Sequence, residues 1–214
     1  MKQRILIGLV AWLGLVGSAS ANLLDRGPDM VYDDVLNITW TRNANLLGSS
    51  GLNWAAANSW AAGLVFGGFS DWRLPTMSST SPATSIFDCS TGTAAACAAS
   101  RNELGYMFYH NLGGTFGTDK TGTQTSLLGG QTLTGIQPLY WSGTGFNSSR
   151  AWGFNFVGGH QFVDVMGLPL SAWAVRAGDV ALIPEPETYA MMLAGLGLMG
   201  FVARRRKRKA AAGA

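Results

Sequence analysis

The hexapeptide Asp71-Trp72-Arg73-Leu74-Pro75-Thr76 places a charged arginine between two large apolar residues, just before a proline. The pattern predicts a short extended segment that ends at Pro75, because proline cannot donate to a strand ladder. The guanidinium of Arg73 must then lie near the core, where it needs a carboxylate or carbonyl partner. We expect a structural ion pair, with Glu103 as the candidate partner. Ligand binding by Arg73, and a helix-capping role for Glu103, are the alternatives.

Two helical segments lie on either side of this hexapeptide in the chain. Asn53 is a suitable N-cap for a helix over residues 54–64, which is rich in alanine. A second helix is predicted over residues 101–110. Each has an apolar face at helical spacing, so each is expected to pack on a sheet. These faces consist of Trp54, Ala57, Ala61 and Leu64 in the first helix, and of Leu104, Met107 and Phe108 in the second.

The strands are predicted from alternating apolar residues and from turn residues. Leu36, Ile38 and Trp40 alternate along one segment, and Asp33-Asp34 precedes it at a predicted turn. A calcium site at this acidic pair is the alternative, although a D-x-D-x-D-G loop is missing. Further strands are predicted over residues 139–142, 150–156, 161–165 and 172–176, with a hairpin turn at Gly158-Gly159. Residues 111–137 are rich in glycine and threonine and are interpreted as a long exposed loop, either a binding surface or a variable one.

These segments, in this order across about residues 30–180, resemble the Lcl C-terminal domain family. That family is similar to the formylglycine-generating-enzyme and C-type-lectin-like group. The resemblance implies an α+β fold with two main helices on small antiparallel sheets. The biochemical function of the family is essentially unassigned. This chain departs from the related enzymes over residues 77–100, which separate the hexapeptide from the second helix.

The inserted segment holds both cysteines of the chain, Cys89 and Cys97. In an oxidising compartment, two nearby cysteines are expected to pair. The disulfide would close a loop over residues 90–96, for which we expect little structure. A redox or metal-binding role is the alternative, but C-x-x-C spacing and a neighbouring histidine are both missing.

The N-terminal 21 residues have the pattern of a secretory signal peptide. Lys2 and Arg4 precede an apolar run over residues 5–16, and Ala19-Ser20-Ala21 fits the cleavage site. We therefore expect the Sec translocon and signal peptidase as partners, and a mature chain that starts at Asn22. An uncleaved membrane anchor is the alternative.

The C-terminal residues 184–214 combine a proline motif, an apolar run and a basic cluster. Pro184, Glu185 and Pro186 favour an extended segment. Residues 189–203 carry no charge and would cover about 22 Å as a helix, short of the ~30 Å hydrocarbon core. We expect a single membrane helix with a cytoplasmic basic stop. The stop consists of Arg204, Arg205, Arg206, Lys207, Arg208 and Lys209. An ordinary tail anchor behind a proline-rich linker is the alternative.

This tail resembles the PEP-CTERM sorting domain of Gram-negative bacteria. The resemblance implies recognition by an exosortase, and a host that secretes exopolysaccharide. It also implies export across the inner membrane, transient anchoring, and a final location at the cell surface or outside the cell. The expected organisation is a signal peptide over residues 1–21, an Lcl C-terminal-like domain over 22–183 and a sorting segment over 184–214. Within the tail, Gly195-Leu196-Gly197-Leu198-Met199-Gly200 matches a dinucleotide fingerprint, which we reject because no βαβ unit surrounds it.

Charge and chemistry restrict the function classes of the body. The body keeps seven of the 15 basic residues and ten of the 12 acidic ones, so it is mildly acidic and no nucleic-acid partner is expected. Hydrolase, zincin and phosphate-loop motifs are missing from the sequence, and His110 and His160 are its only histidines. We therefore expect no catalytic residue, no metal site, no cofactor and no enzymatic activity.

The expected function is that of an exported, non-catalytic binding module, with extracellular polysaccharide as the candidate ligand. A structural biofilm or matrix component, and a degenerate enzyme of the formylglycine-generating group, are the alternatives. Aromatic rings can stack on sugars, but those at alternating strand positions are usually core. Trp40, Trp54, Trp72, Trp141, Trp152 and Trp173 are predicted to be core, whereas Trp60, Tyr109 and Phe146 are less determined.

Overall fold

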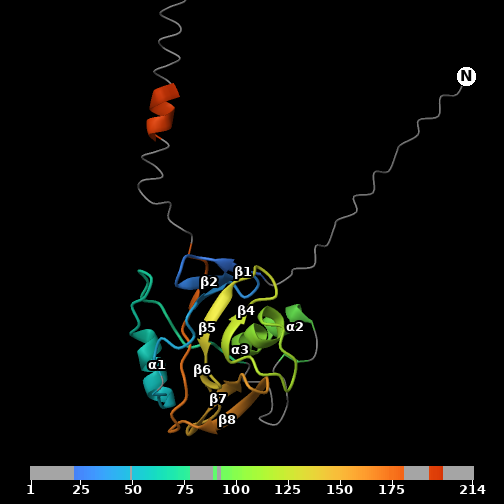
Figure 1. Cartoon of the computed structure of the whole chain (residues 1–214). Helices are drawn as coiled ribbons and strands as arrows, with labels where there is room; N and C mark the ends of the chain where they lie inside the picture. Colours follow the sequence, from blue (N-terminus) through green and yellow to red (C-terminus); the bar gives the residue numbers. More distant parts are fainter. Residues whose placement is uncertain (1–21, 49, 78–88, 91–92, 181–192, 200–214) are drawn as a thin grey trace, which may run out of the picture. The chain divides into compact units, whose positions relative to one another are not determined.

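The computed structural model describes residues 22–48, 50–77, 89–90, 93–180 and 193–199. The chain divides into two compact units, one that ends at Asp179 and one that begins at Val180 (Figure 1). The first unit contains all the strands of the described residues and is an α+β domain of small antiparallel sheets with a few helices. This agrees with the α+β part of the predicted fold class.

The first sheet joins the start of the body to its end. Its strands are β1 (Leu23–Asp25), β2 (Met30–Asp33), β3 (Ile38–Thr41) and β9 (Val175–Ala177), hydrogen-bonded in the order β1-β2-β3-β9. All neighbours are antiparallel, and Trp40 of β3 lies opposite Val175 of β9. The predicted turn after Asp33 is confirmed as the connection between β2 and β3.

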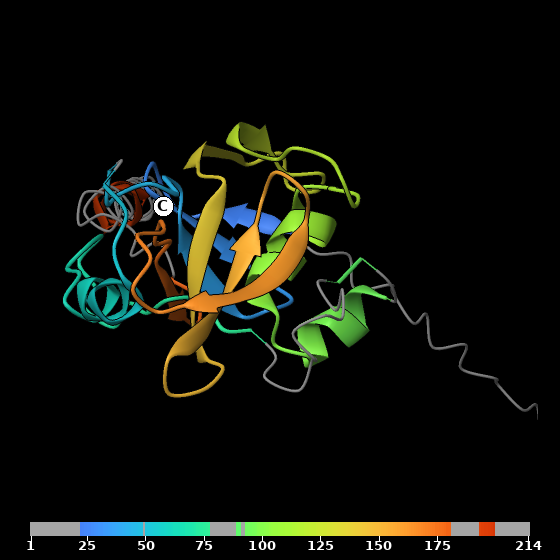
Figure 2. The ribbon, with the colours of Figure 1, turned by 90° about the horizontal axis from the view of Figure 1, so that it is seen from below.

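The second sheet lies between helices on both of its faces. It consists of β6 (Leu139–Gly145), β7 (Arg150–Asn155) and β8 (His160–Val165). On β7, Trp152 and Phe154 pack with residues of α3 (Glu103–Tyr106) and of the π-helical turn η1 (Met107–Asn111). Ala151 faces the other way, toward α1 (Trp54–Ala62). Figures 1 and 2 show α1 on one side of this sheet and α3 on the other.

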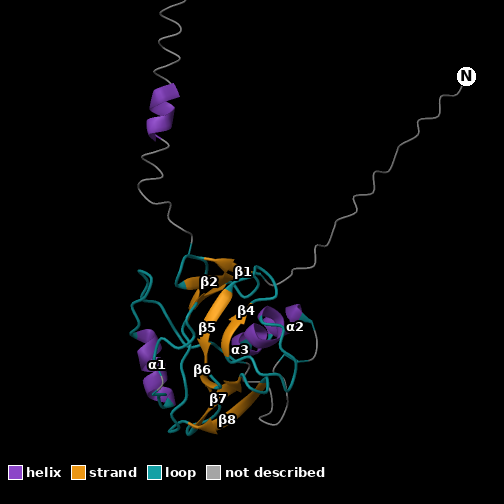
Figure 3. Cartoon of the chain, viewed as in Figure 1, coloured by secondary structure: helices purple, strands orange, loops and turns teal. Residues whose placement is uncertain are grey.

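Two segments are more ordered than predicted. The stretch expected to have little structure contains α2 (Ala94–Ala99), because Thr93 accepts a hydrogen bond from the Ala96 amide and alanine is the strongest helix former. The predicted long loop contains the hairpin of β4 (Gly122–Thr125) and β5 (Thr132–Ile136) (Figure 3). Burial of Leu133 and Ile136 stabilises β5 despite its polar composition. Both predictions were therefore wrong.

The predicted tryptophan core is confirmed with one partial exception. Trp40, Trp72, Trp141, Trp152 and Trp173 are buried. Trp40 and Trp173 meet edge to face with ring centroids 4.8 Å apart, which packs β3 against the segment that leads into β9. Trp54 is half-buried, and its indole N–H donates to the Ser142 carbonyl at 2.8 Å. That bond attaches α1 to β6.

Of the second unit the structure describes Val180 and residues 193–199, and the latter form an exposed helix. Among the residues that the structure describes, none of the helices has both the length and the apolar character that a bilayer crossing requires. The predicted signal peptide and the motif at Pro184, Glu185 and Pro186 lie outside the described residues. So do the basic cluster from Arg204 to Lys209 and most of the run over 189–203.

Candidate functional site

The hexapeptide connects β9 to α3 through Arg73. The backbones of Arg73 and Val175 exchange two hydrogen bonds, of 2.8 and 2.9 Å. The guanidinium donates from Nη1 and Nη2 to the two carboxylate oxygens of Glu103, each at 2.8 Å. Glu103 Oε2 also accepts from the Thr76 amide at 2.7 Å. The predicted partner is thus the observed one, and the carboxylate makes three charge-assisted hydrogen bonds.

A cavity of about 440 Å³ lies beside this ion pair. Its walls come from three places in the fold: the β2–β3 turn, the end of β9, and the α2–α3 junction together with the hexapeptide. Half of the lining residues are apolar and half carry hydrogen-bonding groups. The lining residues are Val35, Leu36, Asn37, Ile38, Arg73, Thr76, Ala98, Arg101, Glu103 and Ala177.

The turn wall is shaped by a buried carboxyl group. Asp33 Oδ1 accepts from the Val35 amide at 3.0 Å and from the Leu36 amide at 2.9 Å, and Asn111 Nδ2 donates to Oδ2 at 2.7 Å. Burial raises the pKa of Asp33 to about 6, although these three hydrogen bonds lower it. The backbone shape of the cavity wall therefore depends on a titratable group behind it.

Asn37 is the polar residue at the tip of this wall. Its φ of 53° is in the left-handed region, which asparagine tolerates better than most residues. The Tyr32 hydroxyl donates to Asn37 Oδ1 at 2.9 Å, and the Asn37 carbonyl accepts from the Gly178 amide at 2.8 Å. The side chain is exposed and fixed in place at the rim of the cavity.

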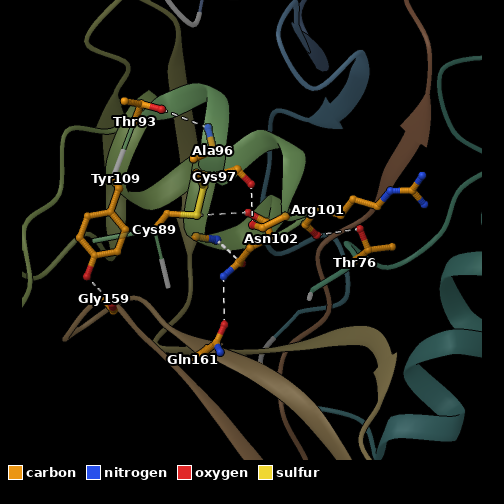
Figure 4. The surroundings of a disulfide bond; sticks show 12 residues. Thr76, Cys89, Thr93, Ala96, Cys97, Arg101, Asn102, Tyr109, Gly159 and Gln161 are labelled. Atoms are coloured by element: carbon orange, nitrogen blue, oxygen red, sulfur yellow. Dashed lines mark hydrogen bonds between the residues drawn. A yellow bond between two sulfur atoms is a disulfide. The ribbon is translucent and has the colours of Figure 1, made fainter. Parts of the chain in front are cut away.

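Arg101 is the second residue with a left-handed backbone at the cavity, with φ of 58°. Its carbonyl accepts from the Thr76 hydroxyl at 3.1 Å, which fixes the α2–α3 junction to the hexapeptide. Figure 4 shows its side chain extending away from the disulfide. Within the described part of the chain, no hydrogen-bond partner is found for its exposed guanidinium. Its donors are thus open to a ligand.

The disulfide braces the same junction. Cys89 and Cys97 are bonded, and no free cysteine remains. Asn102, at the next position after Arg101, caps α3 by accepting from the Gly105 amide at 2.9 Å, and donates to Gln161 of β8 at 3.0 Å (Figure 4). The cysteine pair therefore cross-links α2 to the segment that precedes it, and its sulfur atoms are not available as thiol ligands or nucleophiles.

The titratable groups of the domain are dispersed. Among the described residues, no three histidine, cysteine, aspartate or glutamate side chains gather as a metal site would require. His110 is half-buried on η1, where burial lowers its pKa, and His160 begins β8. The cavity offers hydrogen bonds and apolar contact, which suit binding.

The sequence identified Arg73 and Thr76 as motif residues and Glu103 as the partner of Arg73. It gave no indication that Asn37 and Arg101 line the cavity. The only available signal was weak: asparagine is among the residues that adopt φ above zero. For Arg101 there was no signal, because its place follows from the unexpected helix α2. The predicted motif residues Trp72, Leu74 and Pro75 are buried and serve the core.

Comparison with known families gives two matches. The model described as the Lcl C-terminal domain matches residues 29–176, and the PEP-CTERM protein-sorting motif matches residues 182–207. The first match spans the chain from β2 to the middle of β9, and it includes every cavity residue except Ala177. The second supports exosortase-dependent sorting to the surface. No curated protein matches the chain.

Proposed function

We propose that this chain, which belongs to the Lcl C-terminal domain family and carries a PEP-CTERM sorting motif, is an exported, exosortase-processed surface protein that binds an extracellular polysaccharide. In this proposal the tail anchors the protein transiently in the inner membrane, and the body domain acts outside the cell without catalysing a reaction.

The observation that carries the proposal is the mixed lining of the cavity beside Arg73. Its volume of about 440 Å³ lies within the usual range of small-ligand sites, 300–1,000 Å³. Sugar hydroxyls both donate and accept hydrogen bonds, which matches the amide of Asn37 and the hydroxyl of Thr76. The donors of Arg101 add to this set. The side chains of Val35, Ala98 and Ala177 offer apolar contact to the C–H face of a sugar ring.

The pairing of the charges inside the cavity favours a hydrogen-bonding ligand. Arg73 and Glu103 neutralise each other through a bidentate contact, so neither presents an unpaired charge. Neither lies beside a free thiol, since both cysteines are in the disulfide. These features support a non-catalytic role over the degenerate-enzyme alternative.

A purely structural matrix component remains the competing function. It would need no preformed cavity with fixed polar groups at its rim, such as Asn37.

A measurement of glycan binding distinguishes the two functions. The full chain, purified in detergent, would be applied to an array of extracellular polysaccharides and compared with Ala98→Trp, which fills the cavity from α2. We expect binding by the wild type and a loss of about tenfold in affinity for the variant.

Two results would contradict the proposal. Absence of binding by the wild type to every polysaccharide would favour the structural role. Equal affinity of the wild type and Ala98→Trp would place the binding outside this cavity. The variant's thermal unfolding must stay close to that of the wild type, since Ala98 is only half-buried and an enlarged side chain can extend into the cavity.

A further inference from the structure

A rigid turn presents an aromatic ring to solvent at Phe116. The Thr118 amide donates to the Thr115 carbonyl at 2.9 Å, and the Thr115 amide donates to the Thr118 hydroxyl oxygen at 3.0 Å. Gly117 follows with φ of 84°, a conformation that glycine adopts readily. The Phe116 side chain is 61% exposed. The turn therefore has a defined backbone, and Phe116 on it is largely exposed to solvent.

The turn is attached to the β7–β8 hairpin. The Gly117 amide donates to the Gly158 carbonyl at 2.9 Å, and the Lys120 amide donates to the Phe156 carbonyl at 2.8 Å. These bonds bring Phe116 next to residues some forty positions later in the sequence. One of them is His160, whose ring centroid lies 6.3 Å from that of Phe116 at an interplanar angle of 49°.

Glycine makes room for the imidazole on the hairpin. A Cβ atom at Gly158 would lie only 2.9 Å from His160 Nδ1, so the ring lies directly over the glycine backbone. Val157, the preceding residue, is also exposed. We call the group Phe116, Val157 and His160 the Phe116 shelf: two exposed apolar residues and an imidazole, on a turn and a hairpin that backbone hydrogen bonds join.

We propose that the Phe116 shelf is a stacking subsite for one pyranose ring of the polysaccharide. This inference rests on the proposed function and adds a second contact outside the cavity beside Arg73. The C–H face of a pyranose is apolar and matches one aromatic ring in size, while its rim carries hydroxyl groups. His160, whose Nε2 lies 3.5 Å from the Asn155 amide nitrogen, borders the ring with a polar imidazole, and Thr115 of the same turn is an exposed hydroxyl residue.

Size and rigidity support a sugar ring over a protein partner. A stable protein interface buries about 800 Å² on each side, far more than two apolar side chains supply. A single exposed phenylalanine is ordinary on a protein surface. Here, however, the backbone of the turn that carries the ring is bonded within itself and to the β7–β8 hairpin, so that binding requires no ordering of the turn.

The test measures the affinity of the full chain in detergent by affinity electrophoresis. The probes are laminarin, dextran, xylan and the polysaccharide fraction of the producing strain's culture medium. We expect Phe116→Ala to weaken binding about tenfold, and Phe116→Trp to bind as the wild type does. Phe146→Ala is the matched control, because Phe146 is another exposed phenylalanine, at the β6–β7 turn, and should leave affinity unchanged. Thermal unfolding of each variant checks the fold.

The outcomes separate the subsite from the general function. If the wild type binds and Phe116→Ala binds equally well, the subsite is wrong and polysaccharide binding stands. If Phe116→Leu matches the wild type while Phe116→Ala does not, apolar contact suffices and stacking is overturned. If the wild type binds none of the four probes, the proposed function fails and the subsite fails with it.

Discussion

Arg73 and Glu103 face each other in a bidentate ion pair, 2.8 Å at both contacts, although thirty residues separate them in the chain. The Glu103 carboxylate is nearly buried, at 9% exposure of the side chain, whereas the Arg73 side chain is 37% exposed. Since the same carboxylate holds the Thr76 amide, the pair connects β9, the hexapeptide and α3 at the floor of the cavity.

Glu103→Gln should destabilise the domain more than the loss of a surface ion pair. We expect the free energy of unfolding to fall by about 2–3 kcal/mol, because charged hydrogen bonds are lost and the Arg73 guanidinium is left without its counter-charge. Asp71→Asn is the control, since Asp71 pairs with Arg176 but is 56% exposed; it should cost at most about 1 kcal/mol. Urea unfolding measures both, and equal losses would contradict a special role for Glu103.

A double variant separates a structural pair from a simple charge effect. Arg73→Met combined with Glu103→Leu removes both charges and keeps apolar volume. We expect it to be more stable than Glu103→Gln, because no unpaired charge remains near the core. A double variant less stable than the single one would show that the hydrogen bond to Thr76 carries most of the energy.

The sequence made this pair predictable and left the cavity hidden. An arginine between apolar residues requires a partner, and the next predicted helix contains one acidic residue, Glu103. The cavity instead depends on α2 and on two left-handed residues, Asn37 and Arg101, whose backbone angles are set by tertiary contacts. The Phe116 shelf was missed for the same reason: Phe116 was placed in a featureless loop, and only the hydrogen bonds to Gly158 and Phe156 give it a fixed position.

Asp33 should make stability depend on pH. Its pKa is about 6 in the folded domain, above the ordinary 3.8, so the folded state binds the proton more tightly than the unfolded state. The stabilisation that comes from the protonated Asp33 is then complete below about pH 4 and is lost as pH rises through 6. The free energy of unfolding should fall by about 3 kcal/mol over this range. Asp33→Asn should remove this component. Urea unfolding between pH 4 and 7 would show a smaller decline for the variant.

The asparagine variant can also keep the turn intact. Its carbonyl oxygen can accept from Val35 and Leu36, as the carboxylate does. Asn111 Oδ1 is buried and has no partner among the described residues, so a rotation of the Asn111 amide would provide an acceptor for the new NH₂ group. Identical pH profiles of stability for the wild type and the variant would show that Asp33 is not the source of the pH dependence.

Asn37 allows the cavity to be tested with little effect on the backbone. Asn37→Gly removes the amide but suits the positive φ, so the free energy of unfolding should change by less than about 1 kcal/mol. We expect a several-fold loss of polysaccharide affinity, on the order of one hydrogen bond. Asn37→Ala should lose the same affinity and about 1 kcal/mol more stability. If Asn37→Gly binds as tightly as the wild type, the turn wall is not part of the site.

The disulfide should stabilise the α2–α3 junction. Replacement of Cys89 and Cys97 by alanine removes a short closed loop, and we expect a loss of about 2–3 kcal/mol in the free energy of unfolding. Thermal unfolding with and without reductant measures it: the wild type should respond to reductant, whereas the double variant should not. A wild type whose unfolding is unaffected by complete reduction would show that α2 is held by its packing alone.

The sorting motif gives a prediction that is independent of the body domain. Pro184→Ala combined with Pro186→Ala should prevent recognition by exosortase, because the prolines restrict the motif to an extended form. In the producing strain, the variant should accumulate in the inner membrane as the longer species, while the wild type is found at the surface or in the medium. Thr188→Ala is the control, since it changes a residue just after the Pro-Glu-Pro triplet and leaves the triplet itself intact. Fractionation followed by mass determination of the C-terminus measures the outcome. If the double-proline variant is processed normally, the Pro-Glu-Pro triplet is not required for localisation. That result would favour the ordinary tail anchor over transient attachment.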